Sequence, residues 1–209
     1  MRKLKNLSGA KLIVFCAVLL TVIWFGKNLF AFGYETFARS TGKMETVTLS
    51  ADDFQLIGIV KTDEGKYITT DGDPQLVLEQ QMKISRITLN STFSVAPGEM
   101  VVYYAENPGQ PYSAAKRYWF YTDAASGNGY TASMPIKNLA SIRIDPTTIA
   151  GNSMEIESIV LNSPKSFIEF FAVDFRTVFN LLVYSAIIAT VITLIKETFS
   201  GFSFKGFKK

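Results

Sequence analysis

Aromatic side chains crowd one stretch of this sequence, and their chemistry suits the binding of sugars. Eight of them fall between residues 103 and 130: Tyr103, Tyr104, Tyr112, Tyr118, Trp119, Phe120, Tyr121 and Tyr130. Sugars present CH-rich faces that stack on aromatic rings, while phenol and indole groups supply hydrogen bonds. Strand alternation places Tyr118 and Phe120 on one sheet face and their neighbours on the other, so at least half of the group is expected in the core. Tyr112, Trp119 and Tyr121 are the candidate glycan contacts.

Charged side chains form two further candidate sites. Arg143 and Asp145 share one face of a short predicted strand that ends before Pro146. They can form a structural pair or bond a turn, or they can contact a glycan, and both alternatives stay open. Asp71 and Asp73 lie in an Asp-Gly-Asp-Pro turn and could bind calcium through their oxygens. Their spacing is not that of an EF-hand, and such aspartates commonly cap turns instead.

The sequence argues against catalysis. Histidine is absent, which removes His-based triads, His metal ligands and the usual general base. The only cysteine is Cys16, so Cys-based zinc sites and disulfides are excluded as well. Glu155 and Glu157 share a predicted strand face, but a solvated face explains them better than a glycosidase acid pair. We therefore predict a protein with no catalytic residue, for which calcium is the one cofactor candidate.

The middle of the chain is patterned as short strands separated by turn signals. The predicted strands are residues 46–49, 54–60, 66–70, 75–79, 83–92, 99–105, 116–122, 141–145 and 154–161. Gly, Pro, Asn and Asp between them mark turns, and several strands alternate with period two. This pattern predicts a mainly β fold, an extracytoplasmic jelly-roll β-sandwich held between an N-terminal and a C-terminal transmembrane helix.

Two apolar runs bracket these strands. Residues 177–195 contain no ionisable side chain, and 19 residues come close to the roughly 20 needed to cross a bilayer. Residues 12–26 are also uncharged, and the run continues to Tyr34 if Lys27 extends to the interface. A cleaved signal peptide is the alternative for the first run. No A-x-A-like site follows it, so a retained anchor is favoured.

Charge is segregated between the termini and the middle of the chain. Residues 34–175 carry 17 acidic and 11 basic side chains, whereas the rest carries 10 basic side chains and one acid, Glu197. A nucleic-acid binder would carry basic charge on its folded part, so that class is excluded. Basic residues before the first run and after the second place both termini in the cytoplasm. The expected location is the bacterial cytoplasmic (inner) membrane.

The predicted organisation has six parts. They are a cytoplasmic N-terminus (1–11), transmembrane helix 1 (12–34), an extracytoplasmic β-sandwich domain (35–162), an interfacial helix (163–176), transmembrane helix 2 (177–195) and a basic cytoplasmic tail (196–209). Ser163 and Pro164 form the expected start of the interfacial helix. The tail is predicted as an interfacial anchor or a disordered basic segment.

Four segments together resemble a known domain type. They are residues 67–78 (YITTDGDPQLVL), 101–105 (VVYYA), 142–146 (IRIDP) and 156–161 (IESIVL). Their order and spacing resemble the galactose-binding-like, carbohydrate-binding-module-like jelly-roll domains of bacterial membrane proteins and glycosyltransferases in cell-surface polysaccharide assembly. The resemblance covers about residues 54–161 and implies carbohydrate-associated membrane machinery. The chain departs from that setting because it has no glycosyltransferase domain and no many-span body, so a fold match alone does not fix its function.

Two functional hypotheses follow. The first is a non-enzymatic accessory membrane protein of cell-envelope polysaccharide synthesis or export, which presents a carbohydrate-binding-like domain outside the membrane. The second is a structural or assembly subunit of a membrane protein complex, whose outer domain binds protein instead of glycan. Both include the membrane and a multi-span partner such as a glycosyltransferase or exporter, and the first adds a surface glycan.

Overall fold

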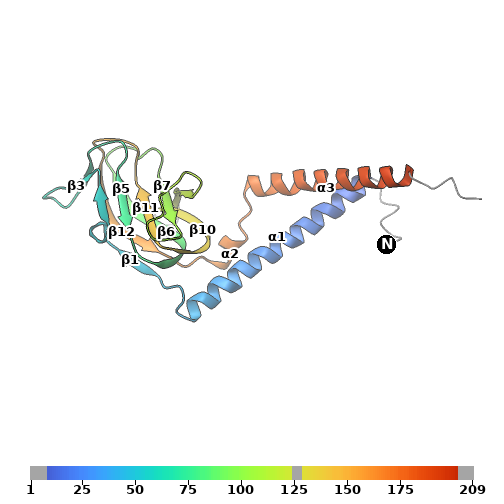
Figure 1. The fold of residues 1–209 in the computed structure, drawn as a ribbon, viewed down its shortest axis with the longest axis horizontal. Coiled ribbons are helices and arrows are strands. Elements are labelled where there is room, and N and C mark those ends of the chain that lie inside the picture. The colour runs from blue at the N-terminus through green and yellow to red at the C-terminus, as the bar shows by residue number, and fades with distance from the viewer. Residues whose placement is uncertain (1–8, 124–128, 202–209) are drawn as a thin grey trace, which may run out of the picture. The chain divides into compact units, whose positions relative to one another are not determined.

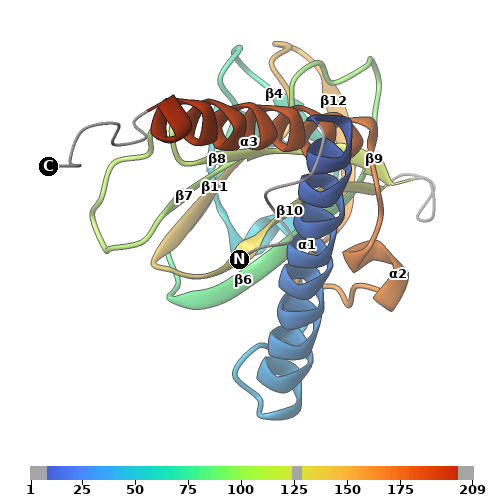
Figure 2. The same cartoon turned by 90° about the vertical axis from the view of Figure 1, so that its right-hand side faces the viewer.

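The computed structural model describes residues 9–123 and 129–201. Their contacts divide the chain into two compact units. The described parts of residues 1–34 and 165–209 form a helical unit, and residues 35–164 form a unit of strands, called the β domain below. Helix α1 (Gly9–Ser40) is one continuous helix whose last residues belong to the β domain (Figure 2).

The β domain consists of two antiparallel sheets (Figure 1). The seven-stranded sheet has the order β3-β4-β12-β6-β10-β9, and β1 also pairs with β12. Its strands are β1 (Val47–Leu49), β3 (Ile59–Lys61), β4 (Tyr67–Thr69), β6 (Met82–Phe93), β9 (Tyr121–Asp123), β10 (Gly129–Leu139) and β12 (Ser153–Leu161). The five-stranded sheet has the order β2-β5-β11-β7-β8. Its strands are β2 (Gln55–Ile57), β5 (Gln75–Leu78), β7 (Val101–Ala105), β8 (Arg117–Trp119) and β11 (Ser141–Asp145). A short 3-10 helix, η2 (Ala51–Asp53), precedes β2.

One hydrophobic core lies between the two sheets. The seven-stranded sheet contributes Ile84, Ile87 and Leu89 of β6, and the five-stranded sheet contributes Ile142 and Ile144 of β11, all at most 1% exposed. These residues recur at every second position or close to it, which is the spacing that puts side chains on one face of a strand. The prediction of a mainly β, two-sheet sandwich is therefore confirmed.

The chain crosses between sheets at two positions inside runs that were predicted as single strands. Gly58 separates β2 of the smaller sheet from β3 of the larger one, with a left-handed φ of 64°. Phe120 separates β8 of the smaller sheet from β9 of the larger one. The predicted strands 54–60 and 116–122 are thus each two strands. At Phe120 the alternation of buried and exposed side chains continues through the crossing, so alternation alone could not show it. At Gly58 the alternation changes phase, because the buried side chains Phe54 and Ile59 are five positions apart.

Strand β10 was not predicted from the sequence. It contains Pro135, and its register with β6 shifts between Ser133 and Lys137. Proline cannot donate to a ladder and is found in sheets at edges or bulges, so the irregular register accommodates it here. The bulge also breaks the alternation by which the other strands were found.

The helical unit contains α2 (Phe167–Phe170), α3 (Phe175–Gly201) and most of α1. Two helical segments, Gly9–Ser40 and Phe167–Thr198, are long and apolar enough to cross a membrane, with mean hydropathies of 2.1 and 2.3. α1 and α3 meet where Leu12 and Cys16 bury Ala189. Ser185, four residues before Ala189, is also buried, so small residues mark this contact.

Helix α2 is shorter than the predicted interfacial helix. It begins after Ser166, which caps the backbone N–H of Glu169, and not after Ser163. Aromatic rings surround it within the helical unit: Phe171 lies against Phe25, and Phe167 against Phe32, with ring centroids 4.8 and 5.1 Å apart. Two parts of the prediction lie outside the described residues. They are the basic side chains before the first apolar run, Arg2, Lys3 and Lys5, and the part of the tail from residue 202 onward.

The chain enters and leaves the β domain at the same end, called the junction end below. Val47 of β1 pairs with Leu161 of β12, and Leu139 of β10 pairs with Met82 of β6. Asn162 connects these strands through its buried side chain, with left-handed φ of 57°. Its amide nitrogen donates to the carbonyls of Glu45 and Lys83, and its amide oxygen accepts from the backbone N–H of Ser85.

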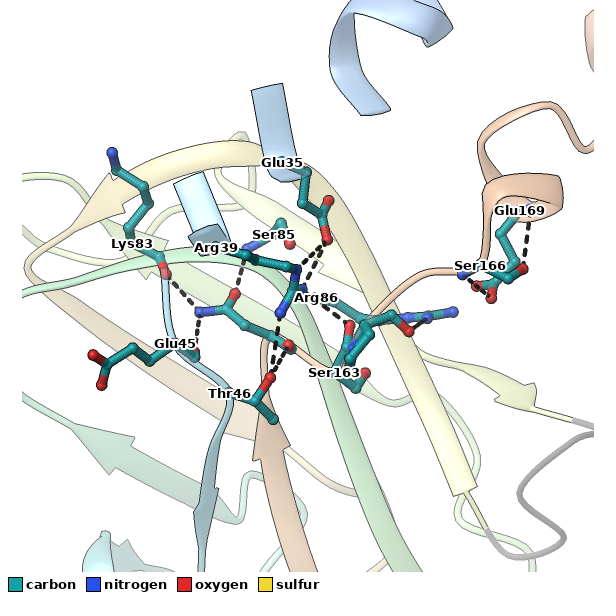
Figure 3. Close-up of polar contacts among 12 residues, drawn as sticks. Glu35, Arg39, Glu45, Thr46, Lys83, Ser85, Arg86, Ser163, Ser166 and Glu169 are labelled. Atoms are coloured by element: carbon teal, nitrogen blue, oxygen red, sulfur yellow. Dashed lines mark hydrogen bonds and ion pairs between the residues drawn. The ribbon is translucent and has the colours of Figure 1, made fainter. Parts of the chain in front are cut away.

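The end of α1 is tied to the same junction. Arg39 donates to the Glu35 carboxylate at 2.8 Å and to the Thr46 hydroxyl at 3.2 Å (Figure 3). The same guanidinium reaches the carbonyl of Ser163 at 3.4 Å. The last turns of α1, the first strand and the exit of the chain are thus joined by one arginine.

Candidate functional site

Trp119 and Tyr121 lie on either side of the Phe120 crossing. Phe120 is 8% exposed and packs into the core, and its backbone N–H donates to the carbonyl of Met100 at 3.0 Å. This leaves Trp119 and Tyr121 pointing outward, 41% and 71% exposed. The alternation expected from the sequence holds for these residues, although they belong to two different sheets.

The indole of Trp119 is held from two directions. Its Nε1–H donates to Glu99 Oε1 at 2.6 Å, and the Arg117 guanidinium carbon lies 4.7 Å from its ring centroid. A hydrogen bond to a carboxylate is stronger than one between neutral groups, and the cation over the ring adds attraction. Among the described residues none bonds the second Glu99 oxygen, Oε2. The ring is therefore oriented while an acceptor beside it stays open.

These side chains surround an open hollow of about 410 Å³. It is lined by Gly98, Glu99, Met100, Trp119, Phe120 and Tyr121. Two exposed aromatic rings offer apolar faces, and the carboxylate accepts hydrogen bonds from hydroxyl groups. A sugar ring, with one CH-rich face and a rim of hydroxyls, matches this combination. The described residues that line the hollow do not supply an acid, a base and a nucleophile together.

Arg143 and Asp145 form a bidentate ion pair. Arg143 Nε and Nη2 donate to the two oxygens of Asp145, each at 2.7 Å, and Nη2 also donates to Asp73 at 2.7 Å. The guanidinium lies 5.0 Å from the ring centroid of Tyr103. Burial raises the pKa of Asp145, although the bonds from Arg143 pull it in the opposite direction. Both oxygens of this carboxylate serve the fold.

The aspartates of the turn are also used internally. Asp71 accepts from the backbone N–H of Asp73 at 2.9 Å, and Asp73 accepts from Gln75 and from Arg143. A cation at Asp73 would have to displace or face the Arg143 guanidinium. Within residues 9–123 and 129–201, no group of three or more acidic, His or Cys side chains could hold a metal ion. Calcium binding at Asp71 and Asp73 stays a prediction, and a bound cation would compete with these internal bonds.

The other aromatic candidates are dispersed. Tyr104 is buried and stacks on Tyr118 with ring centroids 5.8 Å apart, and Tyr130 packs edge-on against Phe93. Tyr112 is half-buried away from the Trp119 hollow, and burial raises the pKa of its phenol. The structure thus unites Trp119 and Tyr121 but places Tyr112 elsewhere.

Glu99 was not singled out from the sequence. It lies just before β7, and it reaches Trp119 because Val101 of β7 pairs with Trp119 of β8. That register follows from tertiary pairing over about twenty residues, so no local pattern signals it. Glu155, by contrast, pairs with Lys66 at 3.1 Å, which fits the solvated face that was predicted.

Solved structures similar to this chain include a carbohydrate-binding module, a lectin domain and a carbohydrate esterase. A low-affinity xylan binding module from Roseburia intestinalis is 12% identical, covers 56% of this chain and 95% of its own, and has a TM-score of 0.37. The lectin domain of lectinolysin, complexed with Lewis B antigen, is 11% identical over 58% and 94%, with a TM-score of 0.38. A family two carbohydrate esterase from Cellvibrio japonicus is 15% identical over 56% of this chain and 33% of its own, with a TM-score of 0.36.

These neighbours include a carbohydrate-binding module, the class of domain that the sequence resembles. At such TM-scores no ligand or activity of this chain follows from them. No protein-family model matches the chain. No similar sequence was found among curated proteins.

Proposed function

We propose that this protein is a non-enzymatic, membrane-anchored glycan-binding protein that acts as an accessory of cell-envelope polysaccharide synthesis or export. The observation that carries the proposal is the hollow in which Trp119 and Tyr121 are exposed beside the Glu99 carboxylate. The indole stacks on a sugar face, Glu99 accepts from sugar hydroxyls, and Tyr121 closes one side. A site this open favours part of a long polymer over an enclosed small molecule.

Glycan binding is tested with the full chain in lipid nanodiscs on an array of bacterial surface polysaccharides. Trp119→Ala should weaken binding about tenfold or more, since an aromatic contact adds about 0.5–1.5 kcal/mol beyond the area it buries. Ile57→Ala is the matched control, because Ile57 is 42% exposed on β2, at the opposite edge of the same sheet. Equal loss in both variants, or binding to no polysaccharide by the wild type, would sink the proposal.

The proposed location is supported by the apolar helices and the charge around them. Both helices cross the cytoplasmic membrane of a bacterium, both termini are cytoplasmic, and the β domain lies outside. Lys11 and Lys196 flank the apolar segments on the terminal sides, as the preference of basic residues for the cytoplasm requires. In a Cys16→Ser background, a membrane-impermeant maleimide should label Ser113→Cys in intact cells but not Lys11→Cys. The reverse pattern would invert the orientation.

The partner is proposed to be a multi-span membrane protein such as a glycosyltransferase or exporter. Most apolar residues of α1 and α3 are exposed in the isolated chain, including Val22, Leu182 and Ile192. Such apolar faces pack against lipid or against the helices of a larger membrane protein. This observation also favours the second candidate, an assembly subunit whose outer domain binds protein. Cross-linking in native membranes separates them: a partner captured equally by Trp119→Ala and wild type, with no glycan bound, favours the assembly subunit.

A further inference from the structure

The charge of the β domain is polarised along its length. Residues 35–164 carry 15 acidic and 10 basic side chains. The junction end carries six of the basic ones, Arg39, Lys43, Lys83, Arg86, Lys116 and Lys137, and only four acids, Glu35, Glu45, Glu79 and Glu106. Its net charge is therefore +2, and that of the remainder is −7. An acidic domain whose basic side chains are concentrated at one end has opposite net charges at its two ends, and an external charged surface can orient it.

Two of these lysines have no acidic partner. Glu35 pairs with Arg39, and Glu106 pairs with Lys116 and Lys137. Within the described part of the chain, no carboxylate lies within ion-pair distance of Lys43 or Lys83. Lys83 is half-buried, and an ammonium that loses water without gaining a counter-charge is unfavourable. The two lysines thus leave room for an external anion.

Both lysines line the same polar hollow at the junction end. Its volume is about 570 Å³, and its walls are Lys43, Gln81, Met82, Lys83 and Asn138. Two ammonium groups and two side-chain amides supply hydrogen-bond donors, and the wall contains no carboxylate. An adjoining hollow shares Lys43, Met82 and Lys83 and is also lined by Glu45. It continues over apolar side chains, among them Val47 and Leu49. Cationic donors beside an apolar floor suit an amphiphile with an anionic head.

Covalent connection brings this end close to the membrane surface. Tyr34 ends the predicted span, and α1 continues from it to Ser40 with a rise of about 1.5 Å per residue. Lys43 follows only three residues later, so its backbone lies within about 20 Å of the span along the chain. The Lys43 ammonium is 6.0 Å from the ring centroid of Phe37, a residue 57% exposed on the last turns of α1. An exposed aromatic beside a lysine is typical of side chains in a headgroup layer.

We infer that the hollow between Lys43 and Lys83 binds the phosphate of an anionic phospholipid headgroup. The headgroup phosphate bridges the two ammonium groups, and Gln81 and Asn138 donate to its remaining oxygens. The acidic remainder of the domain is repelled by the same surface. Lipid contact at the junction end thus orients the far end, which carries the Trp119 hollow, away from the membrane. The inference does not depend on the glycan-binding proposal.

Native mass spectrometry of the full chain tests it, in detergent micelles with equal amounts of phosphatidylglycerol and phosphatidylcholine. Wild type should retain phosphatidylglycerol preferentially. Lys43→Gln with Lys83→Gln should lower that affinity about fivefold for each lysine, the contribution of one cation near an anionic surface. The matched control is Lys61→Gln with Lys66→Gln, which removes equal charge from lysines paired with Asp52 and Glu155.

Three outcomes would overturn the assignment. The first is equal retention of the two lipids by wild type. The second is unchanged phosphatidylglycerol affinity in the Lys43/Lys83 variant, or an equal loss in the control. The third is displacement of the bound lipid by millimolar inorganic phosphate, which would make the hollow a site for a soluble anion. Circular dichroism of both variants excludes misfolding as the cause of a loss.

Discussion

Two clusters on one face of the five-stranded sheet use the same kinds of side chain in opposite ways. Asp145 pairs with Val101, and Val101 pairs with Trp119, so the clusters share a row and lie two strands, about 10 Å, apart. Each has an arginine over an aromatic ring: Arg143 over Tyr103, and Arg117 over Trp119. In the Arg143 cluster the carboxylates bind the arginine. In the Trp119 hollow the carboxylate binds the indole instead, which leaves the site open.

This difference supports the proposal that the Arg143 cluster is structural and that the Trp119 hollow binds a ligand. The bidentate pair at Arg143 uses both oxygens of Asp145, and the guanidinium is also bound to Asp73. A ligand there would have to break existing bonds. At Trp119 the ring is exposed and one oxygen of Glu99 is available, so a ligand adds contacts without breaking any.

The largest effect is expected from opening the closed cluster. Arg143→Leu leaves the largely buried Asp145 without its counter-charge, and we expect a loss of about 3 kcal/mol in unfolding free energy. Chemical denaturation of the purified full chain, followed by β-sheet circular dichroism, measures it. Binding of glycan per folded molecule should not change. A stable variant that has lost glycan binding would move the site to Arg143.

The second largest effect on stability is expected at Gly58, next to the turn that contains Asp71 and Asp73. Gly58 has a left-handed φ, and an added Cβ would lie 2.7 Å from Asp71 Oδ1. Gly58→Ala should therefore destabilise the domain by about 1–2 kcal/mol, from backbone strain and the displaced carboxylate together. Gly65→Ala is the control, since Gly65 has a φ of 81° and open space around it. Equal thermal shifts for both variants would show that the Asp71 contact contributes nothing.

A smaller effect is expected at the open cluster. Glu99→Ala removes the acceptor of the Trp119 indole, and because the bond is exposed the stability should change by less than about 1 kcal/mol. The indole should reorient, which shifts its fluorescence in a Trp24→Phe background with Trp119 as the only emitter. Glu157→Ala, on an exposed strand position, should leave the emission unchanged. An unchanged spectrum in Glu99→Ala would mean that the bond does not hold the ring.

The smallest effect is a difference in pH dependence. Burial raises the pKa of Asp145 above 3.8, so the folded state binds the Asp145 proton more tightly than the unfolded chain does. The resulting stabilisation is present at low pH and is lost as pH rises from 3.8 through the higher pKa of the folded state. Bonds from Lys116 and Lys137 lower the pKa of Glu106 below 4.5, so its contribution is present at higher pH and is lost as pH falls. The stability of wild type relative to Asp145→Asn should fall with rising pH, and relative to Glu106→Gln it should rise. If both stability differences changed with pH in the same direction, the pKa directions given for Asp145 and Glu106 would be contradicted.

The sequence predicted which strands and helices form better than it predicted how the strands are distributed between the two sheets. Alternation located most strands, and the length of the apolar runs located both long helices. It failed where the chain changes sheets. The run containing Phe120 alternates without interruption and the run containing Gly58 changes phase there, yet each was predicted as one strand and contains two. Strand β10 was missed because Pro135 and the bulge interrupt its period.

The candidate site was predicted in part. Exposure of Trp119 and Tyr121 follows from alternation and from burial of Phe120 between them. Glu99 could not be predicted, because only the pairing of β7 with β8 brings it to the indole. The segment around Arg143 and Asp145 matches the domain resemblance, but the ion pair between them could not be inferred from that match. The sequence shows the residue types of the candidate site, but it does not show the hydrogen bonds and ion pairs that these residues form.

The most direct test of the account is the fluorescence of Trp119 during titration of the full chain in nanodiscs with a polysaccharide that it binds on the array. Trp24→Phe leaves Trp119 as the only tryptophan. A sugar that stacks on the indole excludes water from it, so the account predicts a saturable blue shift whose midpoint equals the dissociation constant measured independently. Binding of the polysaccharide at full affinity with no change in Trp119 emission would contradict it.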